Sequence, residues 1–142
     1  EPTLAAWIKR APKNVAVRRV PVAFLQDFEV LQRLYYALEA MGQVDKLHAQ
    51  VFAAIHNERR GFKDANAAAD WVAMQGVERA KFVEQYSSFS VAAKATRAGQ
   101  LTNAYKIDGV PAVGVAGRFL TEGTAKGLQT VEFLVAEIQA GR

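Results

Sequence analysis

The middle of the chain, residues 27–105, carries one helix-type apolar periodicity after another and no strand-type alternation. Gly42 and Gly76 suit the ends of two of these helices, and Asp64 suits the start of one. Because each helix has a single apolar stripe, the stripes must be buried against one another. The pattern therefore predicts a bundle of four or five helices, and any sheet must form from the segments before and after it.

The segments that flank this block have strand and hairpin patterns. Residues 15–24 (VAVRRVPVAF) alternate as a strand does, with Pro21 suited to a strand end or to the margin of a sheet. Residues 112–116 and 118–121 predict two short strands joined through a tight turn at Ala116-Gly117. We therefore expect a β-hairpin directly after the helical block.

A helix is predicted at each end of the chain. Leu4, Trp7 and Ile8 form an apolar stripe that begins near Pro2 without a capping residue before it, so we expect this helix to continue from an earlier segment. The complete order is helix, strand, helical block, hairpin and helix. This order predicts an α/β fold in which a helical domain interrupts a sheet domain.

The composition excludes several classes of protein. Apolar residues make up 51% of the chain and charged residues 23%, which is typical of a globular domain. The net charge is +4, but the basic residues are scattered in small groups. Nucleic-acid binders usually concentrate such charge on one face, so we predict no nucleic-acid partner. The chain has no cysteine, which excludes disulfides and cysteine nucleophiles within it.

The spacing of polar residues predicts neither a metal site nor a cofactor. His48 and His56 are the only histidines, and nothing fixes Glu58 beside them as a third ligand, so packing roles are favoured. Glu78 and Glu84 lie in an exposed pattern that does not favour acid–base catalysis. The sequence also lacks a Gly-rich dinucleotide loop, a phosphate loop and a nucleophile elbow.

The segment G-V-P-A at residues 109–112 stands between a long helix and a hairpin. This is the position of the cis-proline loop in thioredoxin-fold proteins. Together with the order of the elements, it makes nearly the whole chain similar to the DsbA family. The resemblance implies a thioredoxin-like fold interrupted by an inserted helical domain. The implied parts are a thioredoxin-fold part at 1–26, the inserted domain at 27–106 and a second thioredoxin-fold part at 107–142.

The resemblance also implies what lies outside the chain. In the family, a C-x-x-C motif opens the helix that corresponds to residues 2–11, and a strand precedes that motif. The missing strand would lie between strand 15–24 and strand 112–116, and without it the buried backbone groups of strand 15–24 would lack partners. We therefore expect this chain to be the C-terminal part of a longer protein.

The family's activity is the oxidation of dithiols in unfolded secreted proteins of the periplasm. The resemblance implies that Gly109, Val110 and Pro111 bind an extended substrate peptide and that Pro111 is the catalytic residue of the cis-proline loop, where it packs against the redox disulfide. It further implies substrate contacts from Leu128 and Val131. A DsbB-type, quinone-linked membrane oxidase is the implied second partner, beside reduced secreted proteins.

One position beneath the active site often holds a basic residue in the family, and Arg19 matches it. The resemblance implies a part for Arg19 in setting thiol acidity, whereas Arg18 is expected only to extend into water.

The lack of cysteine leaves two alternatives open. The chain as given cannot exchange disulfides, so a cysteine-free thioredoxin-fold module that binds extended peptides is the main alternative. A helical adaptor that binds acidic partners or nucleic acid through its basic surface is a third hypothesis, which strong salt dependence of binding would favour.

Overall fold

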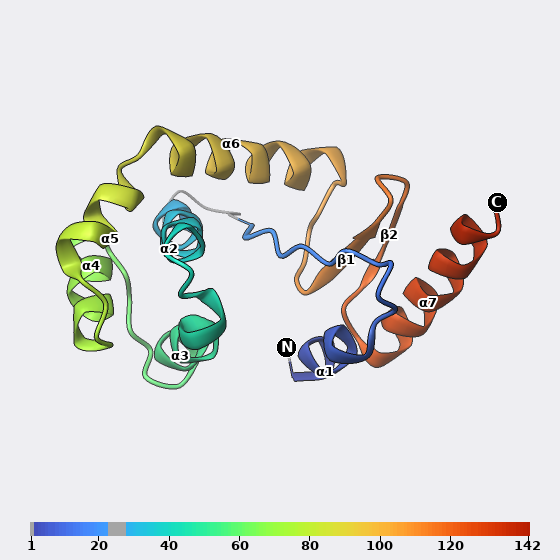
Figure 1. The fold of residues 1–142 in the computed structure, drawn as a ribbon, viewed down its shortest axis with the longest axis horizontal. Coiled ribbons are helices and arrows are strands. Elements are labelled where there is room, and N and C mark those ends of the chain that lie inside the picture. Colours follow the sequence, from blue (N-terminus) through green and yellow to red (C-terminus); the bar gives the residue numbers. More distant parts are fainter. Residues whose placement is uncertain (1, 23–27) are drawn as a thin grey trace. The chain divides into compact units, whose positions relative to one another are not determined.

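The computed structural model describes residues 2–22 and 28–142 (Figure 1). Its residues divide into two compact units. Unit 1 combines residues 1–19 with residues 102–142, and unit 2 comprises residues 20–101. The predicted limits of the inserted domain, residues 27–106, stay a prediction.

Unit 2 consists of helices, as the periodicity of residues 27–105 predicts. Its elements are α2 (Glu29–Ala40), α3 (Val44–His56), α4 (Ala65–Met74), α5 (Arg79–Tyr86) and most of α6 (Phe89–Ala104). Helix α2 packs against α3, α4 and α5. The bundle of five helices among the described residues confirms the predicted bundle.

Three predicted helix boundaries are confirmed. The Asp64 carboxylate accepts a hydrogen bond from the Ala67 N–H at 2.9 Å, which caps the start of α4. Gly42 and Gly76 follow the ends of α2 and α4 with φ of +67° and +87°. This left-handed conformation is one that glycine adopts without steric cost, so both positions end their helices cleanly.

The core of unit 2 lies where α2 meets its neighbours. Phe82 of α5 is fully buried, and Leu34 and Leu38 of α2 are 1% and 2% exposed. Phe62 packs edge-on against Trp71, with ring centroids 5.7 Å apart, which fixes the loop between α3 and α4 onto the bundle. Unit 2 therefore has a hydrophobic core of its own.

Helix α6 joins the bundle through Tyr36 of α2. Tyr36 is buried with Val91 and Ala98 of α6, and Lys94 pairs with Glu39 at 3.0 Å. Burial of the phenol, together with the nearby Glu39 carboxylate, raises the pKa of Tyr36 to about 12. The phenol therefore stays protonated even at a pH where an ordinary tyrosine ionises, so α6 meets α2 across an uncharged ring.

Unit 1 contains a hairpin and two helices. These are α1 (Pro2–Arg10), β1 (Ala112–Val115), β2 (Phe119–Glu122) and α7 (Ala125–Gln139). The strands are antiparallel, with Ala112 opposite Glu122 and Val115 opposite Phe119. The turn has Ala116 and Gly117 at φ of 54° and 70°, and the Arg118 N–H donates to the Val115 carbonyl at 3.0 Å. The predicted hairpin is confirmed, with three of the four strand boundaries shifted by one residue.

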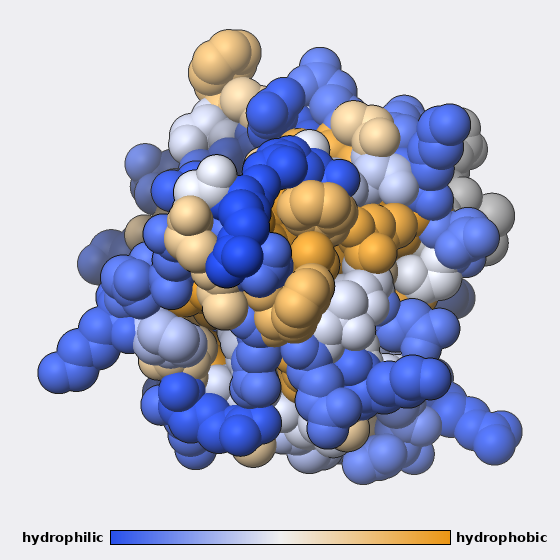
Figure 2. Space-filling model, turned by 90° about the vertical axis from the view of Figure 1, so that its right-hand side faces the viewer, coloured by the Kyte–Doolittle hydropathy of each residue, from blue (hydrophilic) through white to orange (hydrophobic). Residues whose placement is uncertain are grey.

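The core of unit 1 lies between α1, the hairpin and α7. Trp7, Val115, Leu128 and Val131 are buried together. The Trp7 Nε1–H donates to the Glu132 carboxylate at 2.9 Å, so the ring is fixed at both its apolar and its polar side. Figure 2 views the molecule from the side of α7 and shows apolar side chains gathered in the middle of a largely hydrophilic face.

The strand predicted over residues 15–24 is wrong for the residues that the structure describes. Residues 15–22 form neither a helix nor a ladder, and residues 23 and 24 lie outside the described residues. A strand exists only with a partner, and within the described ranges β1 pairs with β2 alone. Residues 15–22 therefore have the side-chain alternation of a strand but no strand beside them to pair with.

Candidate functional site

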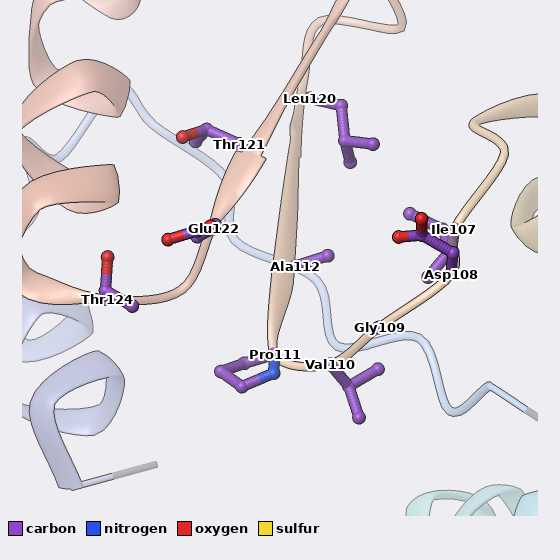
Figure 3. A pocket seen from close by; sticks show the side chains of 10 residues that line it. All are labelled: Ile107, Asp108, Gly109, Val110, Pro111, Ala112, Leu120, Thr121, Glu122 and Thr124. Atoms are coloured by element: carbon purple, nitrogen blue, oxygen red, sulfur yellow. The ribbon is translucent and has the colours of Figure 1, made fainter.

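A cavity of about 420 Å³ opens where the chain passes from α6 into the hairpin (Figure 3). All of the residues that line it belong to unit 1. They are Ile107, Asp108, Gly109, Val110, Pro111, Ala112, Leu120, Thr121, Glu122 and Thr124. The cavity thus brings together the predicted site residues 109–111.

The segment that holds Val110 is fixed on either side of that residue. The Ile107 N–H donates to the Thr102 carbonyl at 3.0 Å, and the Gly123 N–H donates to the Pro111 carbonyl at 3.1 Å. The Val110–Pro111 peptide bond is cis, as the resemblance implies. Val110 lies between these anchors, so its position is set by the elements on both sides.

Val110 itself is open to solvent. Sixty per cent of the surface of Val110 is exposed. Within the described residues, no group forms a hydrogen bond with the Val110 N–H or C=O. Backbone polar groups in an ordered segment normally find a partner, so a solvent-facing donor and acceptor at one residue can accept an extended chain.

Two glycines allow the close packing that supports this segment. A Cβ on Gly123 would lie 2.7 Å from the Pro111 Cβ, and a Cβ on Gly114 would lie 2.8 Å from the Tyr105 ring. Non-bonded carbon atoms do not approach this closely, so a Cβ at 123 would press on the rigid proline ring and a Cβ at 114 would displace the end of the Tyr105 side chain. Gly123 thereby sets the proline ring against the end of β2, and Gly114 lets Tyr105 lie over the hairpin.

The start of α7 lies at the same end of the hairpin as Pro111, directly after β2. The Thr124 hydroxyl accepts a hydrogen bond from the Gly127 N–H at 3.1 Å and caps the helix. A Cβ on Gly127 would collide with the carbonyl oxygen of Glu122. Glycine at 127 is therefore what lets the first turn of α7 pack directly on the end of β2.

Leu128 and Val131 do not line the cavity. They are 2% and 3% exposed and lie in the core of unit 1, where α7 packs on α1 and the hairpin. The apolar stripe of α7 is thus used for packing within the unit. The candidate peptide-binding edge accordingly consists of Gly109, Val110 and Pro111.

Charge at the cavity comes from two residues that the sequence reasoning missed. Asp108 precedes Gly109, and Glu122 ends β2; both are exposed. The only signal for Asp108 was its position directly before the G-V-P-A segment.

The two histidines, His48 and His56, lie on α3 in unit 2. Across the described ranges, no three acidic or histidine side chains form a group that could hold a metal ion.

Helix length bears on membrane insertion. Over residues 2–22 and 28–142, the structure contains no helix with the length and apolar character that a membrane span requires.

Comparisons with known proteins agree with this architecture. The family model described as DSBA-like thioredoxin domain matches residues 9–139. A thiol:disulfide interchange protein DsbA of Bordetella parapertussis is 46% identical over 127 residues, which are 89% of this chain and 60% of that protein. The DsbA of Burkholderia cepacia is 40% identical over 147 residues, covering 98% of this chain and 68% of that protein.

Solved structures give the same result for the fold. The crystal structure of Pseudomonas aeruginosa DsbA superimposes with a TM-score of 0.91 at 30% identity, over 99% of this chain and 76% of that one. The oxidoreductase DsbA of Xylella fastidiosa gives a TM-score of 0.90 at 25% identity, over 98% and 77% of the two chains. The predicted thioredoxin-like fold with a helical insertion is confirmed.

The chain spans 60% of the length of the Bordetella relatives that it matches and 68% of the Burkholderia one. The matched part includes the cavity, the cis-proline segment and both flanking helices. On the family model and these relatives together, the chain belongs to the DSBA-like thioredoxin domain family.

Proposed function

We propose that this chain supplies the substrate-binding edge of a thiol:disulfide oxidoreductase of the DsbA type, which introduces disulfide bonds into secreted proteins. The single observation that carries the proposal is the exposed Val110 backbone beside Pro111 at the mouth of a cavity. The names of the relatives, thiol:disulfide interchange proteins, support the reaction class.

Substrate binding at Val110 uses the physics of strand addition. An extended peptide can donate one hydrogen bond to the Val110 C=O and accept one from its N–H, as a strand does at a sheet edge. Such backbone pairing is independent of the peptide's side chains. It therefore suits an enzyme that must accept many unfolded proteins.

The chemistry is thiol–disulfide exchange. A substrate thiolate attacks one sulfur of a C-x-x-C disulfide, a mixed disulfide forms, and the other sulfur leaves as a thiolate. The second substrate thiol, once deprotonated, then attacks the substrate sulfur of the mixed disulfide. The substrate is oxidised to a disulfide and the C-x-x-C is reduced to a dithiol. This chain has no cysteine, so the proposal requires a C-x-x-C in a part of the protein outside these 142 residues.

Helix α1 supports this exchange. In the proposed arrangement the attacked sulfur opens the helix that α1 continues, and the N-terminal N–H groups and dipole of that helix stabilise a thiolate there. Burial of Trp7 against α7 holds the helix in place. We place the protein in the periplasm, with reduced unfolded secreted proteins as substrates and a DsbB-type, quinone-linked membrane oxidase as the partner that reoxidises it.

A second function is favoured by the composition. The chain has no cysteine at all, so a peptide-binding module without redox activity would use the same edge. Both functions bind an extended peptide at Val110, and only the first requires two thiols. The two are therefore separated by thiol chemistry, not by binding.

We expect the natural gene product, isolated from its own cells, to have an intact mass above 15.5 kDa, the mass of this chain. After reduction it should gain two alkyl groups on treatment with iodoacetamide, and without reduction none. A mass of 15.5 kDa with no alkylation in either sample would contradict the oxidoreductase and leave the peptide-binding module.

The peptide-binding edge is tested by removing one hydrogen-bond donor. We expect Val110→Pro, which lacks the backbone N–H, to weaken binding of an extended peptide about tenfold, because one hydrogen bond is lost and its acceptor is left unpaired. Val110→Ala keeps the N–H and should weaken binding about twofold. Dissociation constants from amide chemical shifts measure both, and equal constants for wild type and Val110→Pro, with thermal midpoints unchanged, would remove Val110 from the site.

A further inference from the structure

Both charged residues that line the cavity are acidic. Asp108 and Glu122 carry negative charge at neutral pH, and the other lining residues are apolar or uncharged. The whole chain has a net charge of +4, so this cavity is opposite in sign to the molecule that contains it. Such a local reversal of charge selects among ligands by their charge.

Neither carboxylate is neutralised by a neighbour. Among the ion pairs of the described residues, none involves Asp108 or Glu122. Both residues are exposed. Lys106 is near Asp108 in sequence but does not line the cavity. The two charges therefore remain available to a bound ligand.

The two carboxylates flank Val110. Asp108 is two residues before it, which places the two Cα atoms at most about 7 Å apart. Glu122 pairs with Ala112, roughly 5 Å across the hairpin, and Ala112 is two residues after Val110. Figure 3 shows Asp108 and Glu122 on opposite sides of the turn that contains Val110 and Pro111. A peptide bound along Val110 thus has a carboxylate toward either end.

Apolar side chains complete the surface between the carboxylates. Val110 and Leu120 are 60% and 45% exposed, and both line the cavity. A side chain with an aliphatic stem and a cationic end fits this combination, because the stem covers the methyl groups while the charge reaches a carboxylate.

We propose that Asp108 and Glu122 make this edge selective for extended peptides that carry lysine or arginine two to three residues from the reactive cysteine. This inference rests on the proposed function, since it specifies which peptides the Val110 edge prefers. Each exposed charge pair contributes a factor of about 1.5 to 5 in affinity. Two pairs, together with repulsion of acidic peptides, give a preference of about tenfold for a lysine peptide over a glutamate peptide.

The experiment uses three heptapeptides that differ only in charge. Each has a central serine in place of cysteine, valine beside it, and lysine, glutamine or glutamate at the two positions two residues away. Binding is followed through the amide shifts of Val110 and Gly109 in the full chain. At about 0.05 M salt we expect dissociation constants that rise from the lysine to the glutamate peptide by about tenfold. At 1 M salt, where the Debye length is about 3 Å, the ratio should fall below twofold.

Variants assign the effect to the two carboxylates. The double variant Asp108→Asn with Glu122→Gln should reduce the ratio between the dissociation constants of the glutamate and lysine peptides to below twofold. The dissociation constant of the uncharged glutamine peptide should keep its wild-type value. Asp108→Lys should lower the affinity of the lysine peptide and raise that of the glutamate peptide. Glu84→Gln, an exposed change of the same charge on α5, is the matched control and should keep the full ratio.

The outcomes separate this inference from the proposed function. Equal constants for the three peptides, with clear shifts at Val110, would overturn the charge preference and retain peptide binding. An unchanged lysine preference in the double variant would likewise overturn the assignment to Asp108 and Glu122. If none of the peptides shifts Val110 or Gly109, the proposed binding edge itself is wrong and the preference falls with it.

Discussion

Gly127→Ala is expected to lower the free energy of unfolding of unit 1 by about 3 kcal/mol or more. The added Cβ would collide with the Glu122 carbonyl, which is backbone held in the hairpin and cannot rotate away as a side chain could. Helix α7 must therefore move from the end of β2. That movement loosens Leu128 and Val131 in the core, and overpacking with loss of core contacts gives penalties of this size.

The control for this substitution is Gly99→Ala. Gly99 lies within α6, and a Cβ there meets nothing within 4 Å. The same added methyl group should raise stability by about 0.5–1 kcal/mol, because alanine favours the helix over the unfolded chain. If Gly127→Ala were neutral or stabilising, the close packing of α7 on β2 would be wrong.

Phe82→Ala is expected to lower the free energy of unfolding of unit 2 by about 3–5 kcal/mol. The Phe82 ring is fully buried in the core of unit 2. Its removal leaves a cavity that the surrounding helices fill only in part, so the transfer and cavity costs add. Phe89→Ala is the matched control, because Phe89 is 88% exposed and its loss should change stability by less than about 0.5 kcal/mol.

The two tryptophans report the two units separately. Trp7 is buried in unit 1 and Trp71 in unit 2, and the chain has no other tryptophan. With 5-fluorotryptophan, urea unfolding can be followed at two fluorine resonances. We expect Gly127→Ala to shift mainly the Trp7 transition and Phe82→Ala mainly the Trp71 transition. Equal shifts at both resonances would contradict separate cores.

The fold could be predicted where local chemistry decides the structure. The Asp64 cap, the glycine at 42 and the Ala116-Gly117 turn are signals within a few residues, and each is present in the structure. The strand prediction was wrong for residues 15–22 because a strand depends on a partner elsewhere in the structure. Alternation of side chains shows which residues share a face, but it cannot supply the ladder.

The lining of the cavity could be predicted only in part. The G-V-P-A segment places residues 109–111 together at the cavity because they are neighbours in sequence, and their part in peptide binding stays a prediction. Leu128 and Val131 have the periodicity of an apolar face, and that periodicity cannot tell a core partner from a ligand. Gly127 owes its importance to a backbone atom five residues earlier. Close approaches of this kind leave no pattern in the sequence.

The two ends of the chain meet in unit 1, and this has a consequence during translation. Trp7 and its hydrogen-bond partner Glu132 are separated by 125 positions, with the whole of unit 2 between them. At about 5–20 residues per second, the ribosome needs roughly 6–25 s to reach Glu132 after it has made Trp7. Unit 2 is a continuous stretch and can bury its core in that interval. Trp7 of helix α1 can be buried only after α7 has been made. Helix α1 therefore stays exposed to chaperones and proteases until α7 leaves the ribosome.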